Sequence, residues 1–188
     1  MILYLHGFRS SPASRKALML RERLQQRGLE NNYRCPALPA SPHAATSLAL
    51  EVARSAPTDE LALIGSSLGG YYATWLAEKL GSRAALLNPA IDPARDLQSH
   101  IGRQPVFFSD DEIDFRPEFI DELRDLDVPV TQPERYFLIA ATGDTVIDYR
   151  TMVAKYVGAR QRVIEGSNHE LSDFTRYIDE VLSFCGIE

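Results

Sequence analysis

Short apolar runs separated by amphipathic stretches constrain the fold of this chain more than any other sequence feature. The runs are continuous, without alternation in polarity, which is typical of parallel strands buried on both faces. Strand-like and helix-like segments alternate along the chain, and this order favours a compact three-layer α/β fold, with a mostly parallel sheet of about six strands and helices on both faces. The expected strands are residues 2–5, 33–38, 61–64, 84–87, 136–141 and 162–164, and the expected helices are 14–27, 42–55, 68–80 and 171–184.

The stretch from 92 to 134 interrupts this alternation. It is too long for an ordinary loop between two elements. Phe115, Phe119, Ile120 and Leu123 have helical spacing, so part of the stretch should pack on the body of the molecule. We therefore expect one or two helices here, forming a small helical cap inserted within a single domain that covers residues 1–188.

Composition and charge exclude several classes of function. The chain has 188 residues, of which 45% are hydrophobic, and a net charge of −6. Residues 110–127 hold nine acidic side chains and two arginines, most simply a solvated helix face, although acids near a site mouth would repel anionic substrates. An acidic chain without a basic stripe argues against nucleic-acid binding. No uncharged apolar run approaches the roughly 18 residues of a membrane helix.

Motifs for bound cofactors or metals are missing from the sequence. It contains no phosphate-binding loop, no dinucleotide-binding glycine pattern and no zinc-binding HExxH. The two cysteines do not make a disulfide framework, and the N-terminal apolar run lacks the basic flank of a signal peptide. We expect a cytoplasmic protein without a cofactor. No sequence pattern specifies its oligomeric state.

Gly65-Ser66-Ser67-Leu68-Gly69 fits the pattern GxSxG, and the motif follows an apolar strand and opens a helix. This context is the one that a nucleophile elbow requires, because the serine occupies a tight, strained strand-to-helix turn. Gly65 and Gly69 remove side chains that would clash in that turn. The motif predicts Ser67 as a nucleophile, with the N–H of Leu68 as one donor to a developing oxyanion.

His169 is the predicted general base, since it lies between the last expected strand and the last expected helix. In this chain order, serine is followed by the acid and then by the histidine. Asp144 comes directly after the preceding strand and is the favoured acid. Asp148 is the rival, although a helix that begins near 147 would make it a capping residue. Asp173 is interpreted as an acid early in the last helix.

The second oxyanion donor should come from the loop after the first strand, which reads His6-Gly7-Phe8. Gly7 lets the backbone turn close to the site, and the N–H of Phe8 is the predicted donor. His6 could be mistaken for a second base. We interpret it as a buried histidine that braces this loop.

With these motifs in hand, the chain resembles the α/β-hydrolases and is most similar to the compact bacterial YqiA-like esterases. The matching pieces are ILYLHGFRSSP, IGSSLGGYYATWLAE, LLNPAI, LIAATGDTVIDYR and EGSNHEL, which follow one another in order along nearly the whole chain. The resemblance implies a reduced hydrolase fold and esterase activity, with acyl thioesters as further substrates. It places Ser67, Asp144 and His169 on the triad positions, and Phe8 and Leu68 on the oxyanion positions.

The expected function is hydrolysis of small esters with short acyl chains, through an acyl-enzyme on Ser67. A thioesterase using the same triad is an alternative, although the segment 92–134 departs from the family pattern and leaves substrate preference open. An alternative of another class is a non-catalytic interaction protein built on a hydrolase scaffold, which would use its acidic surface as a partner patch. Reaction with a fluorophosphonate separates the two classes, because only an activated serine is labelled.

Overall fold

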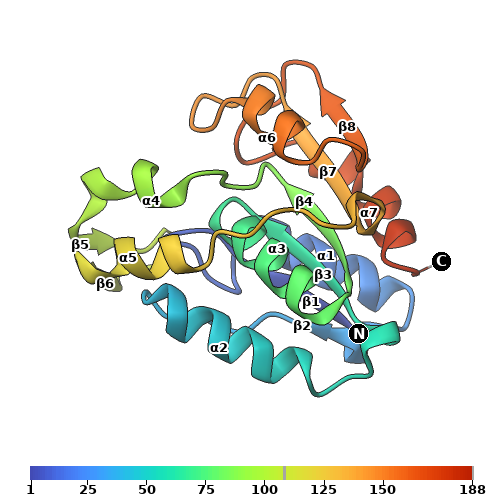
Figure 1. The fold of residues 1–188 in the computed structure, drawn as a ribbon. Coiled ribbons are helices and arrows are strands. Elements are labelled where there is room, and N and C mark those ends of the chain that lie inside the picture. Colours follow the sequence, from blue (N-terminus) through green and yellow to red (C-terminus); the bar gives the residue numbers. More distant parts are fainter. Residues whose placement is uncertain (108, 188) are drawn as a thin grey trace.

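A six-stranded parallel sheet forms the centre of the molecule (Figure 1). The computed structural model describes residues 1–107 and 109–187. Every neighbouring pair of strands in this sheet is parallel, in the spatial order β2-β1-β3-β4-β7-β8. The strands are β1 (Ile2–Leu5), β2 (Tyr33–Arg34), β3 (Ala62–Ser66), β4 (Arg83–Leu87), β7 (Tyr136–Ala141) and β8 (Arg160–Ile164). The predicted sheet is confirmed.

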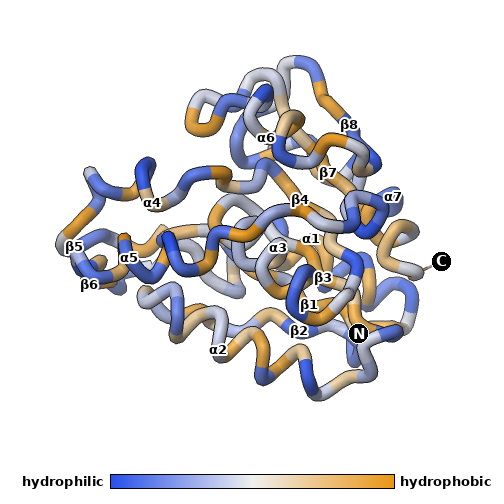
Figure 2. The backbone as a smooth tube through the Cα atoms, viewed as in Figure 1, coloured by the Kyte–Doolittle hydropathy of each residue, from blue (hydrophilic) through white to orange (hydrophobic). Residues whose placement is uncertain are grey.

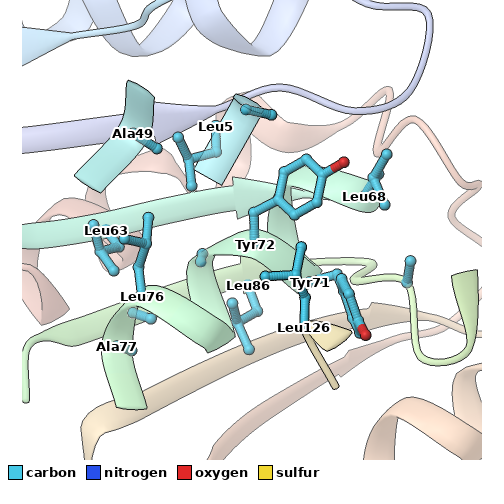
Figure 3. Packing of buried hydrophobic residues seen from close by; sticks show 14 of the residues in the cluster. Leu5, Ala49, Leu63, Leu68, Tyr71, Tyr72, Leu76, Ala77, Leu86 and Leu126 are labelled. Carbon is cyan, nitrogen blue, oxygen red and sulfur yellow. The ribbon is translucent and has the colours of Figure 1, made fainter. Parts of the chain in front are cut away.

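Helices cover both faces of the sheet, because alternate residues of each strand point to opposite sides. On one face, Tyr4, Ile64 and Ile139 pack with α1 (Arg15–Gln26) and α7 (Ile178–Phe184). On the other face, Leu5, Leu63 and Leu138 belong to a core that includes residues of α2 (Pro42–Ala53), α3 (Leu68–Leu80) and α6 (Tyr149–Lys155). Figure 3 shows part of this second core, and Figure 2 shows how hydropathy alternates along α2, which lies on its outside. No helix in residues 1–107 and 109–187 is long and apolar enough to cross a bilayer.

The connection from β4 to β7 contains a β-hairpin that the sequence did not predict. The chain runs through α4 (Pro93–Asp96), β5 (Gly102–Pro105), β6 (Glu112–Phe115) and α5 (Glu118–Asp125). β5 and β6 are antiparallel and separate from the main sheet. The one or two helices expected here are present as α4 and α5, and the hairpin between them is an addition that the sequence did not predict. Phe115 has helical spacing with Phe119 in the sequence, but in the structure it is the buried last residue of β6. The helix α5 begins only after Pro117.

Two other boundaries differ from expectation. The strand expected over 33–38 has only two residues, because Pro36 and Pro39 have no N–H to donate to a sheet. The helix expected over 171–184 begins at Ile178, and a 3₁₀ turn at Phe174–Arg176 precedes it. Leu171 has a φ of 48°, a left-handed conformation that does not continue a helix.

Candidate active site

Ser67 lies at the turn from β3 into α3, with φ 54° and ψ −122°. These angles are strained for a residue with a side chain, so the surrounding structure must hold them. The Ser67 N–H donates to Leu87 O at 3.1 Å, and Ser67 O accepts from the Ala90 N–H at 3.0 Å. Hydrogen bonds to the end of the neighbouring strand β4 and to the residues after it therefore hold the elbow in place.

The two glycines of the motif allow three backbone segments to meet at this turn. A Cβ on Gly65 would lie 2.3 Å from the Gly69 carbonyl oxygen, and one on Gly69 would lie 2.0 Å from the Leu5 carbonyl oxygen. Neither distance leaves room for a side chain, and both opposing atoms are backbone. The predicted need for glycine at both positions therefore has a direct steric cause.

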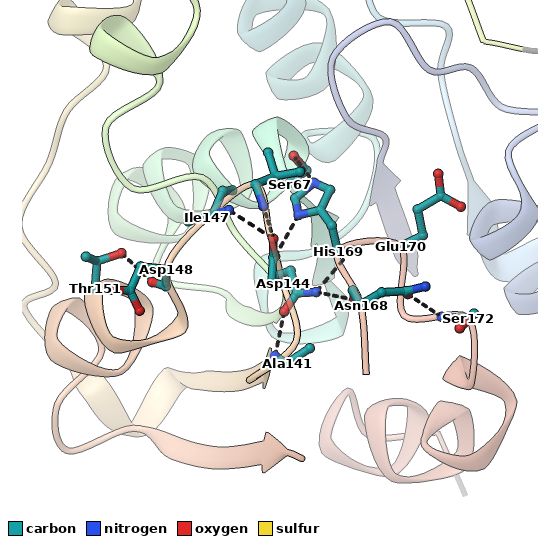
Figure 4. A network of polar contacts seen from close by, with 12 residues as sticks. Ser67, Ala141, Asp144, Ile147, Asp148, Thr151, Asn168, His169, Glu170 and Ser172 are labelled. Carbon is teal, nitrogen blue, oxygen red and sulfur yellow. Dashed lines mark hydrogen bonds and ion pairs between the residues drawn. The ribbon is translucent and has the colours of Figure 1, made fainter. Parts of the chain in front are cut away.

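Ser67, His169 and Asp144 form a continuous chain of hydrogen bonds (Figure 4). His169 Nε2 lies 3.1 Å from Ser67 Oγ, and His169 Nδ1 lies 2.7 Å from Asp144 Oδ2. The side chain of Asp144 is fully buried, whereas that of His169 is 22% exposed. The three residues come from the ends of β3, β7 and β8, and the structure brings them together in the predicted order.

The environment of Asp144 keeps its carboxylate charged. Burial raises its pKa, but hydrogen bonds from His169 and from the N–H groups of Ile147 and Val146 outweigh that effect, so the pKa of Asp144 lies below its ordinary value. One oxygen accepts from the two backbone groups, which leaves the other for His169. A carboxylate held in this way orients the imidazole and stabilises its protonated form.

The other two acids considered from the sequence have structural partners. Asp148 is the N-cap of α6 and accepts from the Arg150 N–H at 2.9 Å, which confirms the interpretation of this residue as a capping acid. Asp173 precedes a 3₁₀ turn, not an α-helix, and accepts from the Ser167 hydroxyl. His169 therefore contacts Asp144 and neither of these alternatives.

The loop after β1 passes directly beside Ser67. A Cβ on Gly7 would come 3.3 Å from Cβ of Ser67, so the backbone approaches the elbow closely here. His6 is buried, accepts from the Leu38 N–H at 3.1 Å and donates from Nδ1 to Gly7 O at 3.0 Å. Burial lowers its pKa, which keeps the imidazole neutral and able to accept. His6 thus braces the loop, as the sequence predicts.

The N–H groups of Phe8 and Leu68 are available to a ligand. Neither donates to an acceptor in the described part of the chain. Leu68 is the first residue of α3, and the N–H groups at the start of a helix carry partial positive charge. Phe8 and Leu68 both border the same pocket as Ser67 and His169. Their placement suits a pair of donors aimed at an oxyanion.

Asn88 is a residue of the site that sequence reasoning missed. It is completely buried at the end of β4, with a φ of 43°. Its Nδ2 donates to the carbonyl oxygens of Asn168 and His169, each at 3.0 Å, and its Oδ1 accepts from the Ala141 N–H at 2.8 Å. One side chain therefore links the ends of β4 and β7 to the loop that carries His169. A polar residue directly after an apolar strand was the signal in the sequence.

Two pockets meet at Ser67 and His169, and both are bordered by Phe8 and Phe107. The larger has a volume of about 500 Å³ and is lined partly by residues of the segment 92–134, with Val146 and Ile147 on the other side. The smaller has a volume of about 180 Å³ and lies against the start of α1. Within residues 1–107 and 109–187, no group of three His, Cys, Asp or Glu side chains could hold a metal ion.

The chain matches the uncharacterised protein family UPF0227 over residues 1–186. It belongs to this family. Solved structures show the same fold at low sequence identity. A protein of Agrobacterium vitis S4 with a provisional hydrolase assignment has a TM-score of 0.77 and 18% identity, covering 98% of this chain and 87% of the other. Mouse alpha/beta hydrolase domain-containing protein 10 has a TM-score of 0.71 and 17% identity, covering 97% and 89%.

A protein solved with a bound small molecule also shares the fold of this UPF0227 protein. Est1E from Butyrivibrio proteoclasticus, solved with ferulic acid, has a TM-score of 0.68 and 13% identity, covering 97% of this chain and 86% of Est1E. These likenesses establish the α/β-hydrolase fold, as the sequence resemblance implied. The shared fold does not specify a reaction, which depends on the residues of the site itself.

Proposed function

We propose that this protein is a serine hydrolase that cleaves carboxylic esters through an acyl-enzyme on Ser67. The observation that carries the proposal is the hydrogen-bonded series Ser67–His169–Asp144, with distances of 3.1 and 2.7 Å, at a strained elbow. A hydroxyl becomes an effective nucleophile when a positioned base can take its proton, and this arrangement supplies the base and the group that orients it.

For each step of ester hydrolysis, the candidate site contains a group that can carry it out. Ser67 Oγ attacks the ester carbonyl carbon while His169 Nε2 takes the hydroxyl proton. The N–H groups of Phe8 and Leu68 bind the oxyanion of the tetrahedral intermediate. His169 then gives the proton to the departing alkoxide, which leaves the acyl group on Ser67. A water molecule, deprotonated by His169, hydrolyses this acyl-enzyme and releases the carboxylic acid.

The larger pocket supports small esters with short acyl chains as substrates. Its volume of about 500 Å³ falls within the range of small-molecule sites, and apolar residues such as Leu97, Val146 and Ile147 line it. We further propose that the segment 92–134 acts as a cap, since Pro93, Leu97 and His100 border this pocket opposite the sheet.

The direct test is hydrolysis of p-nitrophenyl esters from acetate to palmitate by wild type and Ser67→Ala, together with labelling by a fluorophosphonate. We expect turnover and labelling in wild type alone, with the highest kcat/KM for short acyl chains. Matched acyl thioesters in the same panel test the thioesterase alternative. Absence of both turnover and labelling in the folded wild type would favour the non-catalytic interaction protein.

A further inference from the structure

The smaller pocket at Ser67 has a charged wall that ester hydrolysis alone does not require. Ser14, Arg15 and Lys16, at the start of α1, border this pocket of about 180 Å³ together with Ser67 and His169. The larger pocket, by contrast, takes its lining mainly from the segment 92–134 and the loop after β7. A group of the substrate bound at Ser67 can therefore extend toward α1.

Lys16 is the distinctive member of this wall. Its side chain is partly buried, and its Nζ donates to Glu170 O at 2.7 Å. Over the described residues, no carboxylate lies at ion-pairing distance from Lys16, although the chain forms such pairs at many of its other cations. A partly desolvated ammonium without a counter-ion is costly, and a ligand carrying a negative charge would offset that cost.

The other charged groups near Lys16 do not prevent its ammonium from binding an anionic ligand. Arg15 precedes it on α1 and adds positive charge, as does the N-terminal end of this 12-residue helix. Glu170 also borders the pocket, but its side chain is exposed, and Figure 4 shows its carboxylate pointing away from His169. The carboxylate of Asp144 is already bound by His169 and by two backbone N–H groups.

We propose that the smaller pocket binds a carboxylate on the substrate, with the Lys16 ammonium as its partner, so that the preferred esters carry a negative charge beside the scissile bond. This inference rests on the proposed esterase function and assigns its substrate class. Lys16 is then a specificity-determining residue. The carbonyl of Glu170 accepts from one of the three donors of the ammonium, and a second donor is then left for the ligand.

Two matched ester pairs test the assignment on either side of the scissile bond. For the acyl side, the p-nitrophenyl monoester of adipic acid is compared with p-nitrophenyl 6-methylheptanoate, in which an isopropyl group replaces the carboxylate. For the alcohol side, 4-(butyryloxy)benzoate is compared with 4-isopropylphenyl butyrate. We expect wild type to favour the charged member of at least one pair in kcat/KM by about tenfold or more, as a charge-assisted hydrogen bond supports.

Variants separate charge recognition from a structural role of Lys16. In Lys16→Met, the charged-to-neutral ratio of kcat/KM should fall by about tenfold or more, and Lys16→Arg should retain most of the ratio. Lys79→Met is the control, because it removes the same charge from the far end of α3, and it should leave the ratio unchanged. Equal losses on both members in Lys16→Met would show that Lys16 only braces the loop of His169, and this result would overturn the inference.

The pH dependence supplies an independent readout. Burial lowers the pKa of Lys16 to about 8, with Glu170 and Asp144 acting against the shift and Arg15 adding to it. His169 and Tyr4 are the other titratable groups that border the pocket. The charged-to-neutral ratio in wild type should therefore fall as the pH rises through about 8, because Lys16 loses its proton while the substrate carboxylate stays ionised. Any effect of pH that is common to both esters cancels in the ratio. In Lys16→Arg the ratio should stay flat.

Failure of this inference and failure of the esterase proposal give different results. Hydrolysis of the neutral esters without preference for a charged partner in either pair would overturn this inference and leave the esterase proposal intact. No hydrolysis of any of the four esters above the Ser67→Ala background would overturn the esterase proposal and the inference with it.

Discussion

The ends of the sheet strands and the segment 92–134 both border the candidate active site, but they are built very differently. The strand ends hold Ser67, Asn88, Asp144 and His169 through hydrogen bonds between buried backbone and side-chain groups. Apart from the buried Pro93, the segment borders the larger pocket with exposed or partly exposed side chains, such as Phe107, which is 49% exposed. Under the proposed function, we expect the sheet to hold the reacting groups and the segment to shape the space for the substrate.

Removal of the proposed nucleophile should give the largest effect of any substitution. Ser67→Ala should lower kcat by at least about 10⁴-fold, because no other hydroxyl is within hydrogen-bonding distance of His169 in the described chain. Steady-state kinetics measure the loss, and thermal unfolding followed by circular dichroism checks that the fold is retained. Substantial residual turnover by the folded variant would place the nucleophile elsewhere.

Loss of the buried acid should come next. Asp144→Asn should lower kcat by about 10³–10⁴-fold, since the amide no longer stabilises a protonated His169 or selects its tautomer. The matched control is Asp148→Asn, which alters a helix cap and an exposed ion pair with Arg150 and should change kcat by less than about twofold. A larger loss in the Asp148 variant would reverse the assignment of the acid.

Asn88 tests whether the strand ends act as one unit. Asn88→Ala leaves the Ala141 N–H and the His169 carbonyl without a partner, while the Asn168 carbonyl keeps its bond from the Leu171 N–H, so the free energy of unfolding should fall by about 2–3 kcal/mol. As a positioning residue, it should lower kcat by about tenfold with little change in KM. Denaturant unfolding and steady-state kinetics measure the two effects.

Asn168→Ala provides the control for this change. Among the described residues, the exposed Asn168 side chain accepts only from the Ser172 N–H, so its removal should have a small effect on both quantities. If kcat is unaffected in Asn88→Ala while stability falls, Asn88 supports the fold without positioning His169.

The segment should give the smallest effect, and one confined to substrate binding. Phe107→Ala should raise KM several-fold for the longer acyl chains and leave kcat nearly unchanged, because Phe107 borders both pockets from the segment and not from the strand ends that hold the proposed triad. The melting temperature should change by less than about 2 °C, as for other exposed positions. A large loss of kcat would remove the distinction between the two regions.

The sequence predicted the sheet and the elbow well because their signals are local. An apolar run, a glycine pair and a strand-end polar residue each reflect a steric or solvation requirement at one position, as at Gly69 beside Leu5 O. Chain order then brought Asp144 and His169 to the same edge of the sheet as Ser67. Whether these residues catalyse a reaction stays a prediction until activity is measured.

The hairpin and Asn88 could not be predicted in the same way. Arg103 and Gln104 give β5 no alternating pattern that would indicate a strand, and the alternation of polar and apolar residues in β6 extends over only four residues. The role of Asn88 depends on carbonyls about 80 positions away in the chain, which only the folded molecule brings within reach. The segment 92–134 is shaped by tertiary contacts, and its sequence therefore carried the weakest signal.

The route of the chain from β4 to β7 has a consequence for how such proteins diversify. β4 and β7 are parallel neighbours, so their connection needs a crossover, and α5 supplies it with the buried Phe119 and Leu123. Residues 96–107 and 109–114, whose side chains are exposed or partly exposed, are additional to that requirement. This portion can be exchanged for one of a different length, in evolution or by protein engineering, without changing the crossover helix α5 or the proposed catalytic residues.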